Sequence, residues 1–335
     1  MVSLEDSYCH AVYDPANNER FGQTQTIMYT LEGIKKGLSN PRFIFQELDR
    51  LYYRRLKTWP YNKRGINILD QDWDNLLILD GCRYDMFAER IDLPGTLESR
   101  ISLGSSSEEF MERNFVDEQF HDTVYVSANP FIPKLGLNEE TFHMVVDLLD
   151  DRDEELQTIR PDIVAEAARE AHKQYPNKRL IVHFMQPHAP FIGELGREMV
   201  GGGWTMDHEV EDDPGIWNRL RDGEDVPLEK VWQAYKENLD IVLEEAEPLL
   251  SELNGKSVIT ADHGNLVGER LSPIPTRRKY GHPYGVHTEE LVKVPWFVMQ
   301  GSDRREVSAD SPVESNDESV SDEELEDRLE ALGYR

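Results

Sequence analysis

Short apolar runs alternate with longer amphipathic stretches along residues 75–299. The apolar runs are rich in leucine or β-branched residues and lie at 75–80, 123–129, 179–185, 256–262 and 294–299. Between them, residues 138–151, 160–175 and 228–253 carry apolar positions at helical spacing. Strands that are apolar on both faces and alternate with helices are typical of a parallel sheet. The pattern therefore predicts an α/β fold with a mainly parallel central sheet flanked by helices on both faces.

The chain before this region has a different character. Residues 25–57 mix apolar residues with Lys and Arg and are broken at residues 39–41, Ser-Asn-Pro. This predicts two amphipathic helices within an N-terminal helical extension, residues 1–65. Their basic and aromatic composition suits peripheral contact with a membrane or another anionic surface. Packing of this helical extension on the main domain, residues 66–302, is the preferred interpretation, and contact with an anionic surface is the alternative.

The chain after the main domain is strongly acidic. Residues 303–320 are rich in Asp, Glu and Ser, which predicts a disordered or solvated linker. Ser321 and Glu324 then form a capping-box pattern, followed by leucines at helical spacing. We expect a short C-terminal helix within residues 321–335.

The charge balance limits the partners. The chain has 65 Asp and Glu against 36 Lys and Arg, a formal charge of −29. Free nucleic acid is excluded as a partner, since neutralising phosphates needs a basic face. An acidic excess spread over a globular chain, with Arg favoured over Lys, is typical of proteins in concentrated salt, and predicts a halophilic, archaeal source.

Two further features bear on the compartment. Cys9 and Cys82 form no disulfide framework, which fits a reducing interior. The N-terminal residues lack the apolar core of a secretory signal, and no apolar run approaches the length that crosses a bilayer. We therefore expect a soluble, cytoplasmic protein.

Polar residues follow two of the apolar runs at the point where each strand should end. Asp80 comes directly before Gly81, and Asp262 and His263 follow the run at 256–262. In parallel sheets, ligand sites lie at the carboxyl ends of the strands. Two carboxylates and an imidazole suit Mn, Mg, Zn or Ca. Asp80 alone could equally be a helix cap, so the second strand end decides in favour of a divalent metal site at Asp80, Asp262 and His263.

Three segments in this order resemble the alkaline phosphatase and sulfatase superfamily. LLILDGCRYD (76–85) is similar to its opening metal-binding strand, and ITADHGNLVGER (259–270) to its Asp-His-Gly metal motif. YGVHTEELVKVPWFVM (284–299) resembles the segment before the last core strand of sulfatases and of lipoteichoic-acid-synthase-like enzymes. The resemblance covers about residues 72–300. It implies an alkaline-phosphatase-like fold and a metal-dependent phospho- or sulfo-ester hydrolase or transferase with a covalent intermediate.

In that superfamily the nucleophile stands at the start of a helix soon after the first metal-binding Asp. The matching segment is ISLGSSSEEFMERNF (101–115), where three serines precede an amphipathic stretch. The resemblance favours Ser105 as the nucleophile, then Ser107, and leaves Ser106 open. A hydroxyl at a helix N-terminus and beside a divalent metal ionises more easily, although a serine there is also an ordinary helix cap.

One difference from the sulfatase pattern concerns the type of ester that the protein would act on. The Cys-x-Pro-Ser-Arg signature of formylglycine sulfatases is absent, and Cys82 lies too close to the metal Asp to replace it. A serine alkoxide favours phosphate esters or phosphodiesters. The alternatives are a sulfatase without formylglycine and a non-catalytic scaffold that binds a metal and an anion in modification of cell-envelope glycans or lipids.

Histidines downstream complete the predicted site. The segment His188-Ala189-Pro190-Phe191 resembles the superfamily's His-x-Pro-aromatic element, in which His binds the substrate oxyanion or protonates the leaving group. His183 lies inside a strand pattern and is expected to be a hydrogen-bonded core residue. Gln186 stands where relatives often carry Asp, which argues against a complete second metal site.

Two more residues are candidates for binding substrate. His282 lies in YGHPYGVH, where two-metal relatives carry a ligand and one-metal relatives contact the substrate anion, whereas His287 is expected to be structural. Arg83 suits an anion clamp, with an ion pair to Asp85 as the alternative. The sequence thus predicts a phosphoester hydrolase or phosphotransferase whose anionic ester substrate is, for example, a glycan or lipid head group.

Overall fold

The computed structural model describes residues 52, 64–199, 215–271, 278–301 and 303–311 of the chain. Apart from Tyr52, the described residues belong to one compact unit, Tyr53–Arg335. The predicted N-terminal helices lie outside the described residues, except for Tyr52. Among the described residues, no helix combines the length and the apolar character that a membrane crossing requires.

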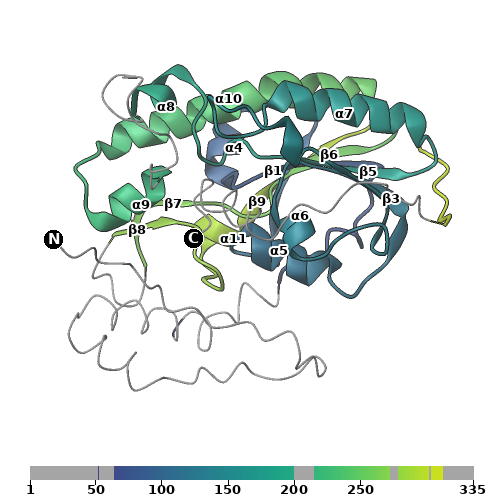
Figure 1. Cartoon of the computed structure of the whole chain (residues 1–335), viewed down its shortest axis with the longest axis horizontal. Coiled ribbons are helices and arrows are strands. Elements are labelled where there is room, and N and C mark those ends of the chain that lie inside the picture. Colours follow the sequence, from purple (N-terminus) through teal and green to yellow (C-terminus); the bar gives the residue numbers. More distant parts are fainter. Residues whose placement is uncertain (1–51, 53–63, 200–214, 272–277, 302, 312–335) are drawn as a thin grey trace. The chain divides into compact units, whose positions relative to one another are not determined.

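A seven-stranded sheet forms the centre of this unit, in the order β2-β9-β6-β1-β5-β3-β4 (Figure 1). Its strands are β1 (Asn75–Leu79), β2 (Thr96–Ile101), β3 (Phe120–Ser127), β4 (Phe142–Asp147), β5 (Arg179–Phe184), β6 (Ser257–Thr260) and β9 (Lys293–Met299). Strand β9 runs antiparallel to both of its neighbours, and the other pairs are parallel. The predicted α/β fold with a mainly parallel sheet is confirmed.

Helices lie on both sides of the sheet (Figure 1). They are α4 (Tyr84–Arg90), α5 (Ser107–Phe115), α6 (Phe131–Lys134), α7 (Pro161–Gln174), α8 (Glu194–Met199), α9 (Gly215–Asp222), α10 (Leu228–Glu252) and α11 (Glu289–Val292). Helix α7 begins with Pro161, whose fixed φ suits a first helical position. Its buried Val164, Ala165, Ala168 and Ala171 recur at helical spacing and place α7 against β5 and β3. The strands β1 and β6 are buried along their whole length, as their continuous apolar runs predict.

One predicted helix is wrong. Residues 138–151 contain strand β4 and a short 3-10 turn, η2 (Leu149–Asp151). Strand β4 pairs with β3 at the edge of the sheet, where Val145 and Val146 are only partly buried. The spacing of apolar residues in this segment fits both a helix and a strand. Its adjacent β-branched residues Val145 and Val146 favour a strand, which forms by pairing with the free edge of β3. Strand β2 and the hairpin of β7 (Leu266–Arg270) and β8 (Arg278–Gly281) were not predicted either.

Part of the predicted acidic linker is fixed to the body. Arg304 pairs with Asp72 at 2.7 Å, and the buried ammonium of Lys178 lies 2.8 Å from Asp310. Residues 303–311 therefore form an extended segment that is anchored to the domain by ion pairs. In one pair the segment provides the basic group, and in the other it provides the carboxylate. Residues 312–320 and the predicted helix at 321–335 lie outside the described residues, and the predicted domain boundaries stay predictions.

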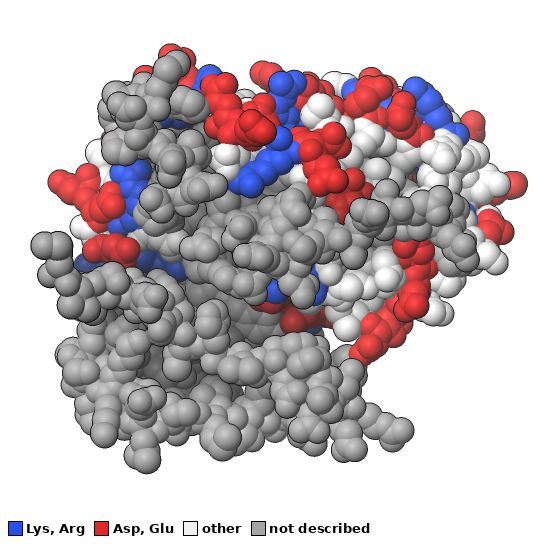
Figure 2. Space-filling view, in the orientation of Figure 1, with Lys and Arg blue, Asp and Glu red and all other residues white. Residues whose placement is uncertain are grey.

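The acidic excess appears on the outer surface. Figure 2 shows acidic side chains over much of the upper part of this face, above α7 and α10, with basic ones between them. Some are paired, such as Glu252 with Arg169 at 2.6 Å, which joins α10 to α7. Exposed pairs of this kind contribute little to stability, so the charge acts mainly on solubility. The halophilic and archaeal source stays a prediction.

Candidate metal and nucleophile site

Polar side chains converge where four adjacent strands of the sheet end. Asp80 follows β1, Asp262 lies two residues beyond β6, and Asn129 lies two residues beyond β3. His183 is the fifth residue of β5. All four are at most 1% exposed. The order β6-β1-β5-β3 makes these strands neighbours, so the ends of the apolar runs bring their polar residues together.

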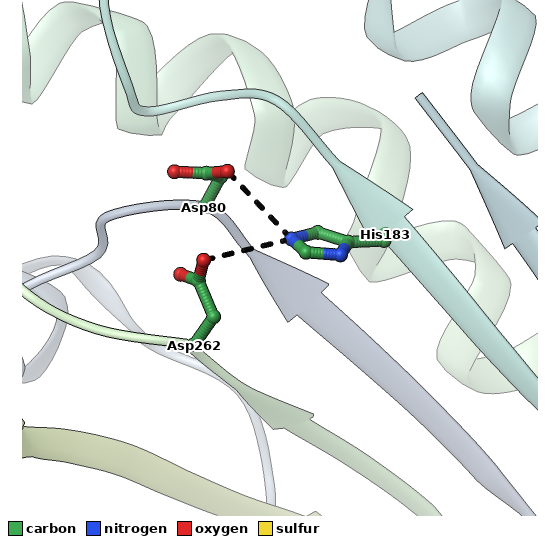
Figure 3. Close-up of side chains that lie close together, drawn as sticks. All are labelled: Asp80, His183 and Asp262. Atoms are coloured by element: carbon green, nitrogen blue, oxygen red, sulfur yellow. Dashed lines mark ion pairs between the residues drawn. The ribbon is translucent and has the colours of Figure 1, made fainter. Parts of the chain in front are cut away.

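Asp80, His183 and Asp262 form a buried group that could hold a metal ion. One ligand atom from each lies within 4.8 Å of the other two. Nε2 of His183 is 3.8 Å from Oδ2 of Asp80 and 3.9 Å from Oδ2 of Asp262. Figure 3 shows the three side chains pointing toward one another from three strands. The predicted pairing of Asp80 with Asp262 is thus observed, together with an imidazole that the sequence placed in the core.

The chemistry of this group fits a divalent cation. Oδ2 of Asp262 and Nε2 of His183 are buried and have no hydrogen-bond partner among the described residues. Burial raises the pKa of Asp262, but the neighbouring His263 and His183 and a hydrogen bond from Gly81 lower it further, so the net shift is downward and the carboxylate stays charged. Burial lowers the pKa of His183 to about 4, so its imidazole is neutral at pH 7. A buried carboxylate is costly unless a cation balances its charge.

His263 presents a lone pair to the same carboxylates. Its Nδ1 lies 2.7 Å from the carbonyl oxygen of Gly264. Because a carbonyl only accepts, Nδ1 carries a proton, and in the neutral ring this leaves the lone pair on Nε2. Nε2 lies 3.5 Å from Oδ2 of Asp262 and 3.6 Å from Oδ1 of Asp80. The predicted ligand His263 is therefore oriented and in the right tautomer to bind a metal.

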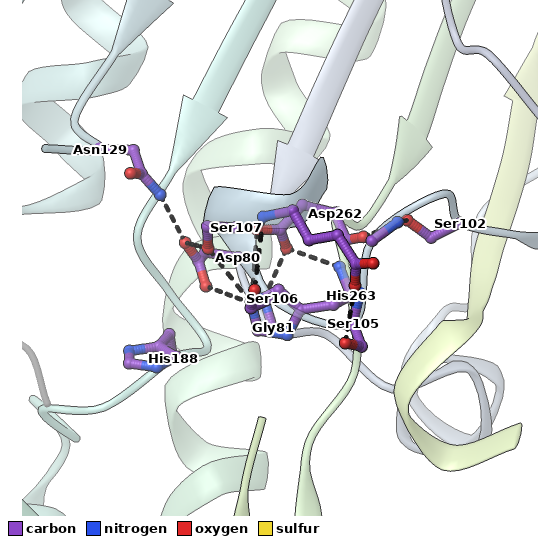
Figure 4. A network of polar contacts seen from close by, with 12 residues as sticks. Asp80, Gly81, Ser102, Ser105, Ser106, Ser107, Asn129, His188, Asp262 and His263 are labelled. Atoms are coloured by element: carbon purple, nitrogen blue, oxygen red, sulfur yellow. Dashed lines mark hydrogen bonds and ion pairs between the residues drawn. The ribbon is translucent and has the colours of Figure 1, made fainter. Parts of the chain in front are cut away.

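Ser107 is the serine that reaches this group. It is the first residue of α5, and its hydroxyl lies 3.1 Å from Oδ2 of Asp80 and 3.2 Å from Nε2 of His263. Asn129 donates to the same Asp80 oxygen at 2.8 Å. Figure 4 shows this network of contacts around Asp80.

The other two serines face elsewhere. The hydroxyl of Ser105 lies 2.9 Å from Oε2 of Glu109 and 3.0 Å from the carbonyl oxygen of Pro283. Ser106 is the N-cap of α5 and accepts from the Glu109 amide. The sequence-based preference for Ser105 is therefore not supported by the geometry, because a buried carboxylate holds Ser105 away from the metal group.

Two glycines allow the strand ends to approach one another. Gly81 has φ +65°, a conformation that favours glycine, and its N–H donates to Oδ1 of Asp262 at 2.9 Å. A Cβ at Gly264 would lie 2.1 Å from the carbonyl oxygen of Glu290. The metal-binding loop therefore lies close against α11, and the Gly264 N–H donates to the carbonyl oxygen of Leu291 at 2.7 Å.

His188 and His282 lie beside His263. The ring centroids of His263 and His282 are 4.6 Å apart, and those of His188 and His282 are 4.8 Å apart. Burial, followed by the neighbouring His263, lowers the pKa of His188 to about 4. Its Nδ1 lies 2.5 Å from the carbonyl oxygen of Ala189, so the neutral ring carries its proton there. In this state His188 accepts a proton, whereas the predicted protonation of a leaving group requires the imidazolium.

Arg83 is held in ion pairs. Its guanidinium binds Asp85 at 2.7 and 2.9 Å and also contacts Glu269. It donates as well to the carbonyl oxygen of Asn265 at 3.1 Å. The alternative of an ion pair with Asp85 is therefore what the structure shows. Substrate binding by Arg83 stays a prediction that this geometry does not favour.

Sequence reasoning missed two residues of the site. Asn129 stands at the end of the run at 123–129, so the rule that placed Asp80 and Asp262 at strand ends also points to it. His183 carries no comparable signal, because it lies one residue before the end of β5. Its neighbour Gln186 turns away and donates to the carbonyl oxygen of Ile159 at 3.1 Å.

Comparisons with known proteins give similarity only to solved structures. No family model and no curated protein matches the chain. The C-terminal periplasmic domain of EcEptC from Escherichia coli, in complex with Zn, is 13% identical with a TM-score of 0.45, over 70% of this chain and 75% of that one. The corresponding domain of the phosphoethanolamine transferase EptC from Campylobacter jejuni is 14% identical with a TM-score of 0.41, over 67% and 78%. The soluble domain of lipooligosaccharide phosphoethanolamine transferase A from Neisseria meningitidis is 13% identical with a TM-score of 0.38, over 67% and 75%.

These transferases belong to the alkaline phosphatase and sulfatase superfamily, which is the one that the sequence motifs resemble. At such identities and TM-scores the similarity concerns the fold, and the argument for function depends on the site itself.

The predicted cytoplasmic location is contradicted. The similar domains from Escherichia coli and Campylobacter jejuni are periplasmic. The prediction came from features that the sequence lacks, and such absences do not establish a compartment. The cytoplasmic location is therefore withdrawn.

Proposed function

We propose that the protein transfers a phosphoryl or substituted phosphoryl group through a phosphoserine at Ser107. One observation carries this proposal: the Ser107 hydroxyl lies within 3.2 Å of both a buried carboxylate, Asp80, and Nε2 of His263. A hydroxyl so placed lies beside two of the side chains that would hold a metal ion, so an ion bound there would also be close to the serine oxygen. The nucleophile and the groups that would activate it are thus together.

The residues that would hold the metal are Asp80, Asp262 and His263. A divalent ion bound there supplies Lewis acidity, which lowers the pKa of a coordinated hydroxyl and stabilises charge on phosphoryl oxygens. Ser107 stands at the start of a nine-residue helix, where free N–H groups favour an anion. The carboxylates hold the cation, and the helix end favours the phosphate.

The covalent step transfers the group to the chain. Oγ of Ser107 bonds to phosphorus, and the bond from phosphorus to the ester oxygen breaks, so that this oxygen leaves with the bonding electron pair. The serine proton passes toward Oδ2 of Asp80, and the leaving oxygen takes up a proton from water. Water or the hydroxyl of an acceptor then attacks the phosphoserine and releases Ser107. Water as acceptor makes the protein a hydrolase, and a hydroxyl on a glycan or lipid makes it a transferase.

The test compares ester classes with several metals. p-Nitrophenyl phosphate, bis-p-nitrophenyl phosphate, p-nitrophenyl sulfate and vesicles containing phosphatidylethanolamine are incubated with the protein and Mn²⁺, Mg²⁺ or Zn²⁺ in high salt. We expect turnover of a phosphate ester with at least one metal, and its loss by about 10³-fold or more in Asp262→Asn. The phosphatidylethanolamine arm is included because the similar structures are phosphoethanolamine transferases.

Three results contradict the proposal. Turnover that survives Asp262→Asn shows that the carboxylate group is not the active centre. Turnover of the sulfate ester alone favours a sulfatase, and metal binding without turnover of any ester favours the non-catalytic scaffold.

A further inference from the structure

His183 lies within strand β5 and is fully buried. Its backbone pairs with Ile78 of β1 and with Ser127 of β3. The side chain points from the strand toward Asp80 and Asp262, as Figure 3 shows. An imidazole so placed faces the metal group from a rigid element rather than from a loop.

The spacing of the three atoms is unsuited to hydrogen bonds. Nitrogen to oxygen hydrogen bonds are about 2.7–3.2 Å long. Nε2 of His183 is 3.8 and 3.9 Å from the two carboxylate oxygens, and it has no hydrogen-bond partner among the described residues. Ligand atoms about 2.0–2.2 Å from one metal ion lie about 3–4 Å apart, since the ion stands between them. The observed spacing therefore matches atoms that share an ion.

A second contact fixes the orientation of this ring. Nδ1 of His183 lies 2.9 Å from the hydroxyl of Tyr125 on the neighbouring strand β3. Tyr125 is fully buried, and burial together with the nearby Asp262 and Asp80 keeps its pKa well above 10. The hydroxyl is thus neutral, and its oxygen can accept a hydrogen bond from Nδ1–H. Metal-binding histidines commonly donate their other N–H to an oxygen in this way.

We propose that His183 is a ligand of the metal ion held by Asp80 and Asp262, with Tyr125 accepting the hydrogen bond from Nδ1. This inference rests on the metal site of the proposed function and adds to it. The ion is then held from three strands, β1, β5 and β6, with His183 and His263 each near both carboxylates. In the metal-bound form Nε2 of His183 carries no proton, and Nδ1 carries it toward Tyr125.

A nitrogen ligand from the strand changes which ions the site prefers. Imidazole binds Zn²⁺, Co²⁺ and Mn²⁺ better than it binds Ca²⁺ or Mg²⁺, which prefer oxygen. With His183 as well as His263, we expect the protein to retain Zn²⁺ or Mn²⁺ and to release Ca²⁺ on dialysis.

The experiment measures metal binding in the absence of any substrate. Zn²⁺ affinity is determined by calorimetry for the full chain, and Co²⁺ absorption reports the ligands. His183→Asn keeps a polar group near Nδ1 for Tyr125 but removes Nε2, and we expect Zn²⁺ affinity to fall by about 100-fold with a changed Co²⁺ spectrum. His143→Asn is the matched control, a buried histidine on edge strand β4, and its Zn²⁺ affinity should stay within about threefold.

A second variant covers the case in which His183→Asn does not fold. Tyr125→Phe keeps the ring and removes only the acceptor of the Nδ1 proton, and Zn²⁺ affinity should fall by about 10-fold or more. Unchanged affinity and an unchanged Co²⁺ spectrum in His183→Asn, or unchanged affinity in Tyr125→Phe when the first variant cannot be made, would overturn the inference. No metal binding by the unsubstituted protein would overturn both this inference and the metal site of the proposed function. Metal binding that depends on His183, without phosphate turnover, would overturn the proposed function alone.

Discussion

The hydroxyl of Ser107 lies 3.2 Å from Nε2 of His263, and Nδ1 of the same ring donates to the carbonyl oxygen of Gly264. The serine and the histidine come from segments 156 positions apart. One is fixed by the start of α5 and the other by the end of β6. The contact therefore depends on the sheet, which places these two ends side by side.

Substitution of Ser107 and substitution of Ser105 should affect turnover differently. Ser107→Ala removes the hydroxyl that faces Asp80 and His263, and we expect phosphate ester turnover to fall by about 10³-fold or more. Ser105→Ala removes a hydroxyl that faces Glu109, and turnover should stay within about tenfold. Steady-state kinetics of the two variants measure this difference.

Trapping the phosphoserine intermediate would identify directly which serine is the nucleophile. Acid quenching during turnover, followed by peptide mass spectrometry, should locate the phosphate on Ser107. A phosphate on Ser105 or Ser106 would show that the loop rearranges when substrate binds and that the serine assignment is wrong.

Asn129 should act through Asp80. Its amide donates to Oδ2 of Asp80 at 2.8 Å, and it is 1% exposed. Asn129→Ala leaves this oxygen without that donor, and outer contacts of this kind are worth about 10–100-fold in metal affinity. We expect a loss of that size in Zn²⁺ titrations, with the fold retained by circular dichroism. An affinity within threefold of the unsubstituted protein would mean that Asp80 needs no orientation.

Glu109 should make stability depend on pH. Burial raises its pKa, but His287, Arg113 and the Ser105 amide lower it further, to about 2. Its folded pKa is thus below the ordinary value of about 4.5, so the stabilisation is present above pH 4.5 and is lost as pH falls toward 2. Glu109→Gln should lower the free energy of unfolding at pH 7 by up to about 3 kcal/mol.

Urea unfolding at several pH values measures this contribution. The difference between the unsubstituted protein and Glu109→Gln should shrink as pH falls from 4.5 to 2, because the native carboxylate becomes protonated. Glu112→Gln is a matched control on the same helix, since Glu112 has a raised pKa and does not contact Ser105. A difference that is constant with pH would contradict the charged state of Glu109.

The sequence predicted the sheet because its central strands are buried on both faces. The strands in runs such as 75–80 and 256–262 carry no charged residue before Asp80 and Asp262, so the carboxyl end of each strand is visible in the sequence. Edge strand β4 has a partly exposed face and resembles an amphipathic helix, and only pairing with β3 decides between them. The structure thus follows the sequence where burial is complete and departs from it where burial is partial.

The residues of the site could likewise be predicted only in part. Asp80, Asp262 and His263 were predictable because each ends a strand. The choice among the serines was not, because it depends on Glu109, a buried carboxylate that the sequence shows only as part of an acidic helix start. His183 was expected to be a core residue, and its bond to Tyr125 agrees with that. Its other ring nitrogen, Nε2, faces the carboxylates because of the register of β5 against β1. A register between distant strands cannot be recognised from the local sequence.

Arg83 provides the sharpest test of an ion pair against a substrate contact. Its side chain is 9% exposed, and its partners Asp85 and Glu269 are 54% and 27% exposed. Arg83→Met keeps the apolar stem but leaves two carboxylates without their cation. Since these partners are partly hydrated, we expect a loss of about 2 kcal/mol in the free energy of unfolding, less than for a fully buried pair.

The same variant should bind substrate normally. An arginine that clamps the phosphate would raise KM by about tenfold or more when removed, whereas an arginine occupied by Asp85 and Glu269 would not. Arg169→Met, which breaks an exposed pair with Glu252, is the control for stability and should cost less than about 1 kcal/mol. A large rise in KM with unchanged stability would return Arg83 to the substrate site, and it would mean that the ester displaces Asp85 from the guanidinium when it binds.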